Sequence, residues 1–129
     1  MLPLCRDQGV GVIPYSPLAS GRLTRDWASE TTLRSETDQI QKMKYDATVE
    51  ADKKVVERVA ELAERRGASR THIALAWLLH KSPVTAPIIG ATKLSHLDEA
   101  AGALSVKLTD EEITYLEERY VPHGVVGHQ

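Results

Sequence analysis

Hydrophobic positions recur at helical spacing through the middle of the chain. The pattern predicts a helix over residues 48–66 with one apolar face. The positions that form this face are Val55, Val56, Val59, Leu62 and Ala63. Gly67 is suited to end this helix in a left-handed conformation, and Ser69 is suited to cap a second one. The second helix contains the run IALAWLL, which leaves little polar surface and therefore predicts a mostly buried helix.

Stop and cap signals predict three more helices nearer the ends of the chain. Residues 2–8 are typical of the end of a helix, which Gly9 stops. The stretch SHLDEAAGAL predicts a helix with Ser95 as its N-cap. Thr109 and Glu112 form the T-x-x-E pattern of a capping box ahead of a last amphipathic helix.

Two short runs, residues 10–13 and 86–89, are continuously apolar and predict strands. The long connection between them predicts a parallel pair, and their unbroken hydrophobicity is typical of strands covered on both faces. Two strands do not make a stable sheet by themselves. We therefore expect an α/β fold in a single incomplete domain over residues 1–129, with a flexible tail over 121–129 and self-association through exposed strand edges.

The composition is that of a globular protein, with 42% hydrophobic and 26% charged residues. A net charge of -2 gives no electrostatic reason to expect a nucleic acid or an anionic membrane as partner. The single cysteine, Cys5, excludes an internal disulfide and a cysteine metal cluster. No run approaches the roughly 18 apolar residues of a membrane span, and the N-terminus lacks a signal-peptide pattern, so we expect a cytoplasmic protein.

The exit from the first apolar run, YSPLASG, is longer than a simple turn requires. Backbone N–H groups around residues 16–21 suit an anion, and Gly21 allows its close approach. Ser16 and Ser20 add hydroxyl donors, while Tyr15 offers a flat face for stacking on a planar ring. The same residues also suit an ordinary proline-rich strand exit with Tyr15 in the core.

The exit from the second run, IIGATKLSHLDEA, leads into a helix N-terminus. The free N–H groups and the positive dipole end of a helix that follows residues 90–92 favour a phosphate. Lys93 and His96 are further donors, and Glu99 is an acceptor for an amine or a ribose hydroxyl. The alternative is a capped helix with Lys93 and His96 solvated.

The two exits together predict a shared ligand site, which neither exit predicts alone. Consecutive parallel strands place both exits on the face where open α/β sheets and α/β barrels bind ligands. The last two loops of an eight-stranded α/β barrel frequently form a phosphate site. The pair therefore predicts a ligand that has a planar ring and phosphate groups.

Three stretches, in this order, resemble the C-terminal part of the aldo-keto reductases: IPYSPLASGRLTRDW, GASRTHIALAWLLHKSPVTAPIIGATKLSHLDEA and VKLTDEEITYLEERY. The resemblance covers nearly the whole chain, from the end of the sixth helix through the seventh and eighth βα units. It implies a helix-rich C-terminal fragment of a (β/α)8 TIM barrel with two short parallel strands. It also implies an oxidoreductase that moves a hydride between a nicotinamide cofactor and the carbonyl or alcohol of a small substrate.

The resemblance implies a role for individual residues in binding the cofactor. Tyr15 matches the aromatic residue that stacks on the nicotinamide, Leu23 an apolar loop position, and Arg34 falls near an arginine that some relatives use. The pyrophosphate loop is matched by Ser16, Pro17, Leu18, Ala19, Ser20 and Gly21. The adenosine end is matched by Gly90, Thr92, His96, Glu99 and Ala100. Residues 22–47 would form a cofactor lid or a wall of the substrate pocket.

Several positions depart from the family pattern. Many relatives carry a basic residue or glutamine at the position of His96 and an asparagine at that of Ala100, and some carry a lysine where Asp26 stands. These changes remove side chains that would hold the 2′-phosphate of NADP. Lys93 or Arg25 would have to bind that phosphate in their place. NADP is the cofactor that the resemblance implies, with NAD as the alternative.

The family's catalytic tyrosine, lysine, aspartate and histidine come from the first half of the barrel, upstream of Met1. No residue in this sequence matches them, and its histidines lack the spacing of metal ligands. We therefore expect no catalytic residue and no reductase activity in this chain by itself. Its expected role is to hold the cofactor.

Two other classes of function stay open. Arg65, Arg66 and Arg70 flank the turn between two helices, an arrangement similar to a helix-turn-helix nucleic-acid-binding domain. The second helix, however, is too apolar to read base edges. The other alternative is a non-catalytic interaction module, since some reductase-like proteins serve as subunits.

Overall fold

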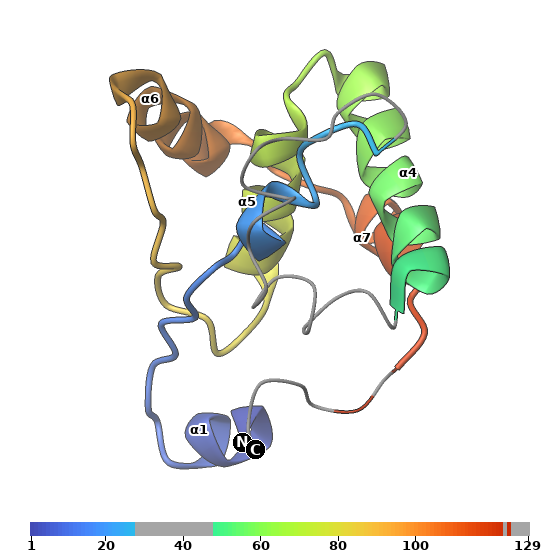
Figure 1. Cartoon of the computed structure of the whole chain (residues 1–129). Helices are drawn as coiled ribbons and strands as arrows, with labels where there is room; N and C mark the ends of the chain where they lie inside the picture. The colour runs from blue at the N-terminus through green and yellow to red at the C-terminus, as the bar shows by residue number, and fades with distance from the viewer. Residues whose placement is uncertain (28–47, 123, 125–129) are drawn as a thin grey trace.

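The computed structural model describes residues 1–27, 48–122 and 124, and these residues form mainly helices (Figure 1). The α-helices are α1 (Leu2–Asp7), α4 (Val49–Arg66), α5 (Arg70–His80), α6 (Leu94–Gly102) and α7 (Asp110–Glu117). Two 3₁₀ turns, η1 (Ala19–Gly21) and η3 (Ala103–Ser105), lie in the first long loop and after α6. Each helix predicted from the hydrophobic pattern is therefore present. Within this part of the chain, no helix combines the length and the apolar character needed to cross a membrane.

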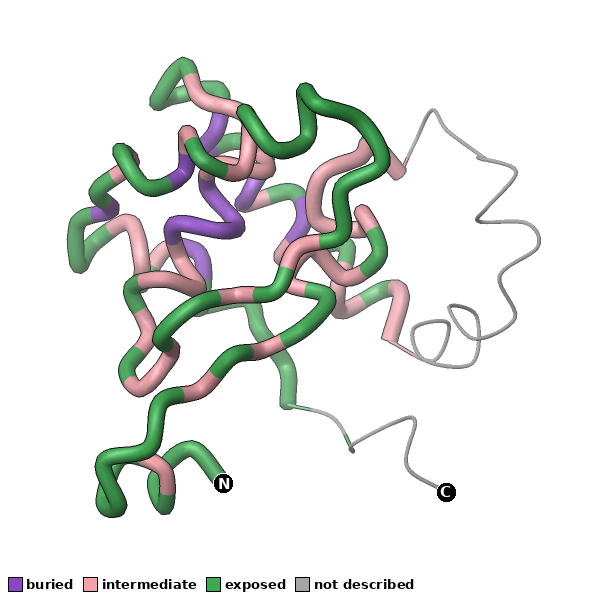
Figure 2. Tube along the Cα trace, turned by 90° about the vertical axis from the view of Figure 1, so that its left-hand side faces the viewer, coloured by how far each residue is buried: buried purple, intermediate pink, exposed green. Residues whose placement is uncertain are grey.

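The hydrophobic core lies between α4, α5 and α7 (Figure 1). Ile73 of α5 is 0% exposed and Leu62 of α4 is 1% exposed, and Figure 2 shows the buried residues inside the helical half of the molecule. The residues of the main buried cluster are Val59, Leu62, Ala63, Ile73, Ala76, Leu108 and Leu116. Both the apolar face predicted for residues 48–66 and the buried second helix are confirmed.

The helix ends follow the local capping signals with one exception. Gly67 ends α4 with φ of 59°, the Ser69 hydroxyl accepts from the His72 N–H at 3.1 Å, and Thr109 with Glu112 forms the predicted capping box. The prediction that Ser95 caps α6 is wrong, because the helix begins at Leu94 with Lys93 as its N-cap. The Lys93 side chain makes no capping hydrogen bond.

The two apolar runs lie side by side in parallel, as predicted. Bridges join Val12 to Val84 and Tyr15 to Ile88. The Val12 N–H donates to the Pro83 carbonyl at 3.2 Å, and the Val12 carbonyl accepts from the Thr85 N–H at 2.8 Å. These contacts are isolated bridges and not continuous strands, because prolines interrupt both segments and cannot donate to a ladder.

Glycine at position 11 permits the close approach of these two segments. A Cβ atom on Gly11 would lie 2.4 Å from Oγ1 of Thr85. The expectation that both faces of the strands are covered is wrong for the described structure. Val10 is 54% exposed, Ile13 is 62% exposed and Ile88 is 51% exposed. No residue of 10–16 or 82–90 is buried.

Candidate functional site

The first exit forms a tightly wound loop after Tyr15. Ser16, Ala19 and Ser20 all have positive φ, a conformation that non-glycine residues rarely adopt, and Gly21 follows with φ of 84°. The Ala19 N–H donates to the Ser16 carbonyl at 3.0 Å, and the Gly21 N–H donates to the Leu18 carbonyl at 2.9 Å to form η1. Each such backbone position costs on the order of 1–3 kcal/mol, so the surrounding contacts must hold the loop in this shape.

Contacts on the C-terminal side of the loop supply that support. Leu23 packs against the hydrophobic core. The Trp27 indole N–H donates to the Arg22 carbonyl at 2.8 Å, and the Arg22 guanidinium lies 4.3 Å from the centre of the Trp27 ring. Arg70, the first residue of α5, donates from Nη1 to the Arg25 carbonyl at 2.8 Å. The loop is therefore anchored to the helical core at a side-chain contact and at a backbone carbonyl.

Two of these anchoring residues were not found by sequence reasoning. No sequence pattern predicts a role for Trp27, and Arg70 enters only the helix-turn-helix pattern. Arg70 lies 45 positions from Arg25, so no local pattern relates the two. The family resemblance implies a role for Leu23 in the cofactor loop, and in the structure Leu23 packs against the core.

The Tyr15 side chain is 68% exposed at the end of the first segment. The reading of Tyr15 as a core residue in a structural strand exit is therefore wrong. Ser16 and Ser20 are also exposed, whereas Pro17, Leu18 and Ala19 are half-buried. The exposed tyrosine and the two serines thus lie on the accessible side of this exit.

The second exit is open to solvent up to the start of α6. Gly90, Thr92 and Lys93 are exposed, and nothing would lie within 4 Å of a Cβ atom on Gly90. The His96 ring turns back toward the helix start, where its Nδ1 accepts from the Thr92 N–H at 3.4 Å. This contact lies before the first turn of α6 and does not cap the helix. Glu99, like its neighbour Ala100, is half-buried.

The parallel pairing brings the two exits to the same end of the molecule. Tyr15, which opens the first exit, is bridged to Ile88, which lies two residues before Gly90. In Figure 1 both extended segments run upward on the left, one toward η1 beside α5 and the other toward α6. Of the predicted site residues, Arg34 lies outside the described residues, as do positions 28–47 of the predicted lid.

This arrangement fits a ligand with a planar ring and phosphate groups. An exposed aromatic ring is followed directly by a left-handed backbone turn, of the kind that lines anion-binding concavities. The facing exit offers an open glycine before a helix N-terminus. Among residues 1–27 and 48–122, no group of three or more His, Cys, Asp or Glu side chains is placed to hold a metal ion.

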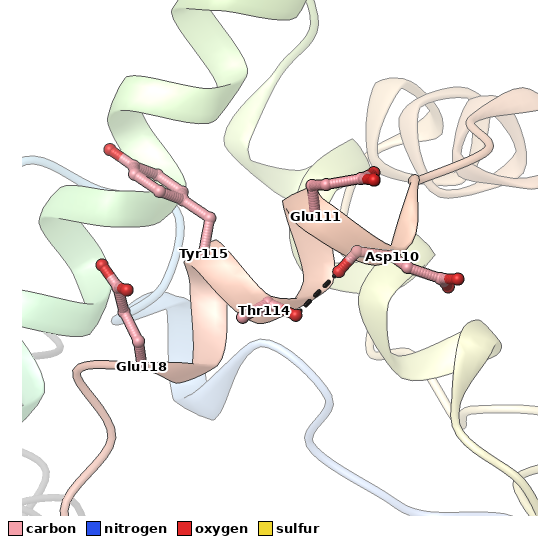
Figure 3. Close-up of a pocket in the computed structure, with 5 residues that line it drawn as sticks. All are labelled: Asp110, Glu111, Thr114, Tyr115 and Glu118. Atoms are coloured by element: carbon pink, nitrogen blue, oxygen red, sulfur yellow. Dashed lines mark hydrogen bonds between the residues drawn. The ribbon is translucent and has the colours of Figure 1, made fainter.

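A surface hollow on α7 lies apart from these exits. It has a volume of about 390 Å³ and is lined by Asp110, Glu111, Thr114, Tyr115 and Glu118 (Figure 3). The Tyr115 hydroxyl donates to Glu61 of α4, and this hydrogen bond raises the pKa of Tyr115. Arg58 and Arg65 lie 3.8 Å and 4.4 Å from the centre of its ring. Tyr115 therefore joins α4 to α7 through its ring and its hydroxyl.

The helix-turn-helix alternative is not favoured by the structure. The helix that would enter the groove, α5, is buried from Ile73 to Ala76. The flanking arginines are also engaged: Arg65 lies over Tyr115, Arg66 pairs with Glu112 at 3.4 Å, and Arg70 holds the first loop.

The model of the aldo/keto reductase family matches residues 1–120. Versiconal hemiacetal acetate reductase of Aspergillus parasiticus is 46% identical over 126 residues, which cover 97% of this chain and 36% of that protein. An aldo-keto reductase of Fusarium vanettenii is 40% identical over 128 residues, covering 99% of this chain and 34% of that protein.

The crystal structure of a thermostable aldo-keto reductase with the inhibitor epalrestat superimposes with a TM-score of 0.60 at 27% identity. The superposition covers 92% of this chain and 32% of the crystallised chain. The chain thus spans about a third of the length of the relatives it matches. The likeness confirms the expected fold class, a helix-rich α/β portion of a (β/α)8 barrel.

Proposed function

Because the chain belongs to the aldo/keto reductase family, we propose that it forms the nicotinamide-binding part of an NAD(P)H-dependent oxidoreductase. The observation that carries the proposal is the parallel pairing of Val12 with Val84 and of Tyr15 with Ile88. This pairing directs the YSPLASG loop and the start of α6 to one end of the molecule. A dinucleotide needs two such neighbouring sites, one for each half.

Each exit has its own part in binding. The exposed Tyr15 ring supports the nicotinamide by stacking, and the backbone of residues 16–21 surrounds the pyrophosphate. The start of α6 and the residues Gly90, Thr92, His96, Glu99 and Ala100 receive the adenosine end. NADP is the proposed cofactor, and Lys93 at the exposed helix start would pair with its 2′-phosphate.

The chemistry that a nicotinamide cofactor supplies is hydride transfer to or from a carbonyl carbon of a small substrate. The contribution of this chain is positional, because the geometry of the reacting atoms depends on a firmly held cofactor. Arg70 is a positioning residue in this scheme, since it acts on the loop through the Arg25 carbonyl. We place the group that protonates the substrate oxygen outside this chain, so the chain alone is inactive.

The test is a titration of the isotopically labelled chain with NADP⁺ and with NAD⁺, followed by amide chemical shifts. We expect shift changes confined to residues 15–21 and 90–100, with dissociation constants weaker than about 1 µM, and tighter binding of NADP⁺. A mixture of the chain with NADPH and a reactive aldehyde is expected to consume no more NADPH than a protein-free blank.

A matched pair of variants tests whether the Tyr15 ring stacks on the cofactor. Tyr15→Ala is expected to weaken binding by about fivefold to tenfold, the loss of one aromatic stacking contact. Tyr120→Ala removes another exposed tyrosine and should leave binding unchanged. Shift changes centred on the α7 hollow, equal effects of the two substitutions, or turnover above the blank would each contradict the proposed function.

A further inference from the structure

We propose that Trp27 is a positioning residue for the pyrophosphate loop, which comprises residues 16–21. Its indole N–H donates to the carbonyl of Arg22, the residue that directly follows the loop, at 2.8 Å. The inference rests on the proposed function, which assigns this loop to the pyrophosphate of the cofactor. It adds a residue outside the loop that holds the loop in its binding shape.

Two carbonyl groups of the loop are engaged by N–H groups of the same segment. The Leu18 carbonyl accepts from the Gly21 N–H at 2.9 Å and from the Leu23 N–H at 3.4 Å. The Ala19 carbonyl accepts from the Arg22 N–H at 3.1 Å. A carbonyl oxygen that faced an anion would repel it, and these bonds hold the two oxygens within the turn.

Two N–H groups of the loop stay available for a ligand. Among the described residues, none accepts from the N–H of Leu18 or from that of Ser20. Leu18 has φ of -104° and Ala19 has φ of 49°, and this change of handedness is the one found in backbone concavities that bind anions. The loop therefore offers these donors to a pyrophosphate only while it keeps its wound shape.

Arg22 connects the wound shape of the loop to Trp27. The Arg22 N–H closes the last turn of the loop at Ala19, and its carbonyl accepts from the Trp27 indole. The Arg22 guanidinium also lies 4.3 Å from the centre of the Trp27 ring. Because Ala19 and Ser20 have positive φ, the loop needs contacts outside itself to keep this conformation. Trp27 supplies them through the backbone and the side chain of Arg22.

The other anchors of this segment have a different effect. Leu23 packs against the core and Arg70 donates to the Arg25 carbonyl, so these contacts fix where the segment lies on the helices. Trp27 bonds to a residue five positions earlier and therefore fixes the shape of the segment itself. Losing this bond should affect ligands that carry a pyrophosphate and spare those that bind only at the start of α6.

The first experiment measures amide hydrogen exchange in the ligand-free chain. Trp27→Phe keeps an aromatic ring and removes the N–H donor. We expect the Gly21 and Leu23 amides to exchange about threefold to tenfold faster, the effect of one hydrogen bond on the opening of the loop. Trp77→Phe is the matched control, because the Trp77 indole N–H donates to Glu117 at 2.7 Å and joins α5 to α7. It should leave the loop amides unchanged.

The second experiment compares two ligands by chemical-shift titration. NADP⁺ carries the pyrophosphate, whereas adenosine 2′-phosphate provides the adenosine end alone. Trp27→Phe is expected to weaken NADP⁺ binding about threefold to tenfold, because fewer molecules hold the loop in its binding shape, and to leave the binding of adenosine 2′-phosphate unchanged. Trp27→Ala also removes the ring contact with Arg22 and should weaken NADP⁺ binding further. Trp77→Phe should change neither affinity.

NADP⁺ should in turn slow the exchange of the Trp27 indole N–H and leave that of the Trp77 indole N–H unchanged. This measurement on the unsubstituted chain is the test if circular dichroism shows that Trp27→Phe loses its helices. Equal effects of Trp27→Phe and Trp77→Phe, equal weakening of both ligands, or faster loop exchange with unchanged NADP⁺ binding would each overturn the proposal. A wild-type chain that binds no NADP⁺ refutes the proposed function, and the loop exchange then still decides whether Trp27 holds the loop.

Discussion

The close approach of residue 11 to Thr85 leads to a sharp prediction for the substitution Gly11→Ala. The added Cβ would lie 2.4 Å from Oγ1 of Thr85 and 3.4 Å from its Cβ. Oγ1 is thus about 1 Å closer than an ordinary contact, whereas the Cβ distance is tolerable. Either Thr85 changes its rotamer or the two segments move apart.

Both responses cost free energy. Forcing extra volume into a packed contact costs typically about 1–3 kcal/mol, and the threonine can relieve part of this by rotating about χ1. We expect the pairing of the segments to weaken by about 1.4 kcal/mol, a factor of about ten in its opening equilibrium. Because the pair lies outside the helical core, the loss should be local.

Native-state hydrogen exchange measures this local opening. The Val12, Thr85 and Ile88 amides donate the hydrogen bonds between the segments, so their exchange should accelerate about tenfold in Gly11→Ala. Amides in the middle of α4 serve as the internal control and should not change.

The double variant Gly11→Ala/Thr85→Ala tests whether the contact with Thr85 causes the faster exchange. Thr85→Ala removes Oγ1 and leaves only the contact at 3.4 Å, so it should restore slow exchange in the Gly11→Ala background. Unchanged exchange in Gly11→Ala would refute the close approach. Accelerated exchange that Thr85→Ala does not reverse would refute the Thr85 contact as its cause.

Two further predictions concern stability, both measured by urea unfolding followed by circular dichroism. Ile73→Ala should lower the free energy of unfolding by about 2–5 kcal/mol, because Ile73 is 0% exposed and its loss leaves a cavity; Val121→Ala, at an exposed position, should cost less than about 0.5 kcal/mol. Burial opposes ionisation of Glu117, but hydrogen bonds from Lys81 and Trp77 outweigh it and hold the pKa of Glu117 below its ordinary value of 4.5. The folded state therefore binds fewer protons than the unfolded state, so this stabilisation is present above pH 4.5 and is lost as the pH falls below that value. Glu117→Gln should be less stable than wild type near neutral pH and equally stable in acid; a difference that persists in acid would contradict the assignment.

The candidate site shows where local sequence signals suffice and where they do not. The two exits could be located because each follows an apolar run and carries its own turn residues. The exposure of Tyr15 could not be derived from its neighbours, since a proline-rich strand exit suits a buried tyrosine equally well. The tether from Arg70 to the Arg25 carbonyl joins two elements that only packing brings together. The capping pattern around Ser95 did not predict that α6 begins at Leu94 without a side-chain cap, or that His96 bonds to the Thr92 N–H.

The sequence by itself determined the helices, most of their caps and the parallel relation of the two apolar runs. Helical periodicity and capping act over a few residues, and a long crossover between two strands favours only parallel pairing. Tertiary structure alone decided which apolar residues are covered. Ile73 and Ile13 are equally hydrophobic, yet one lies at the centre of the core and the other on an open edge. Burial depends on which surfaces the helices can reach, and here they leave every residue of 10–16 and 82–90 at least partly exposed.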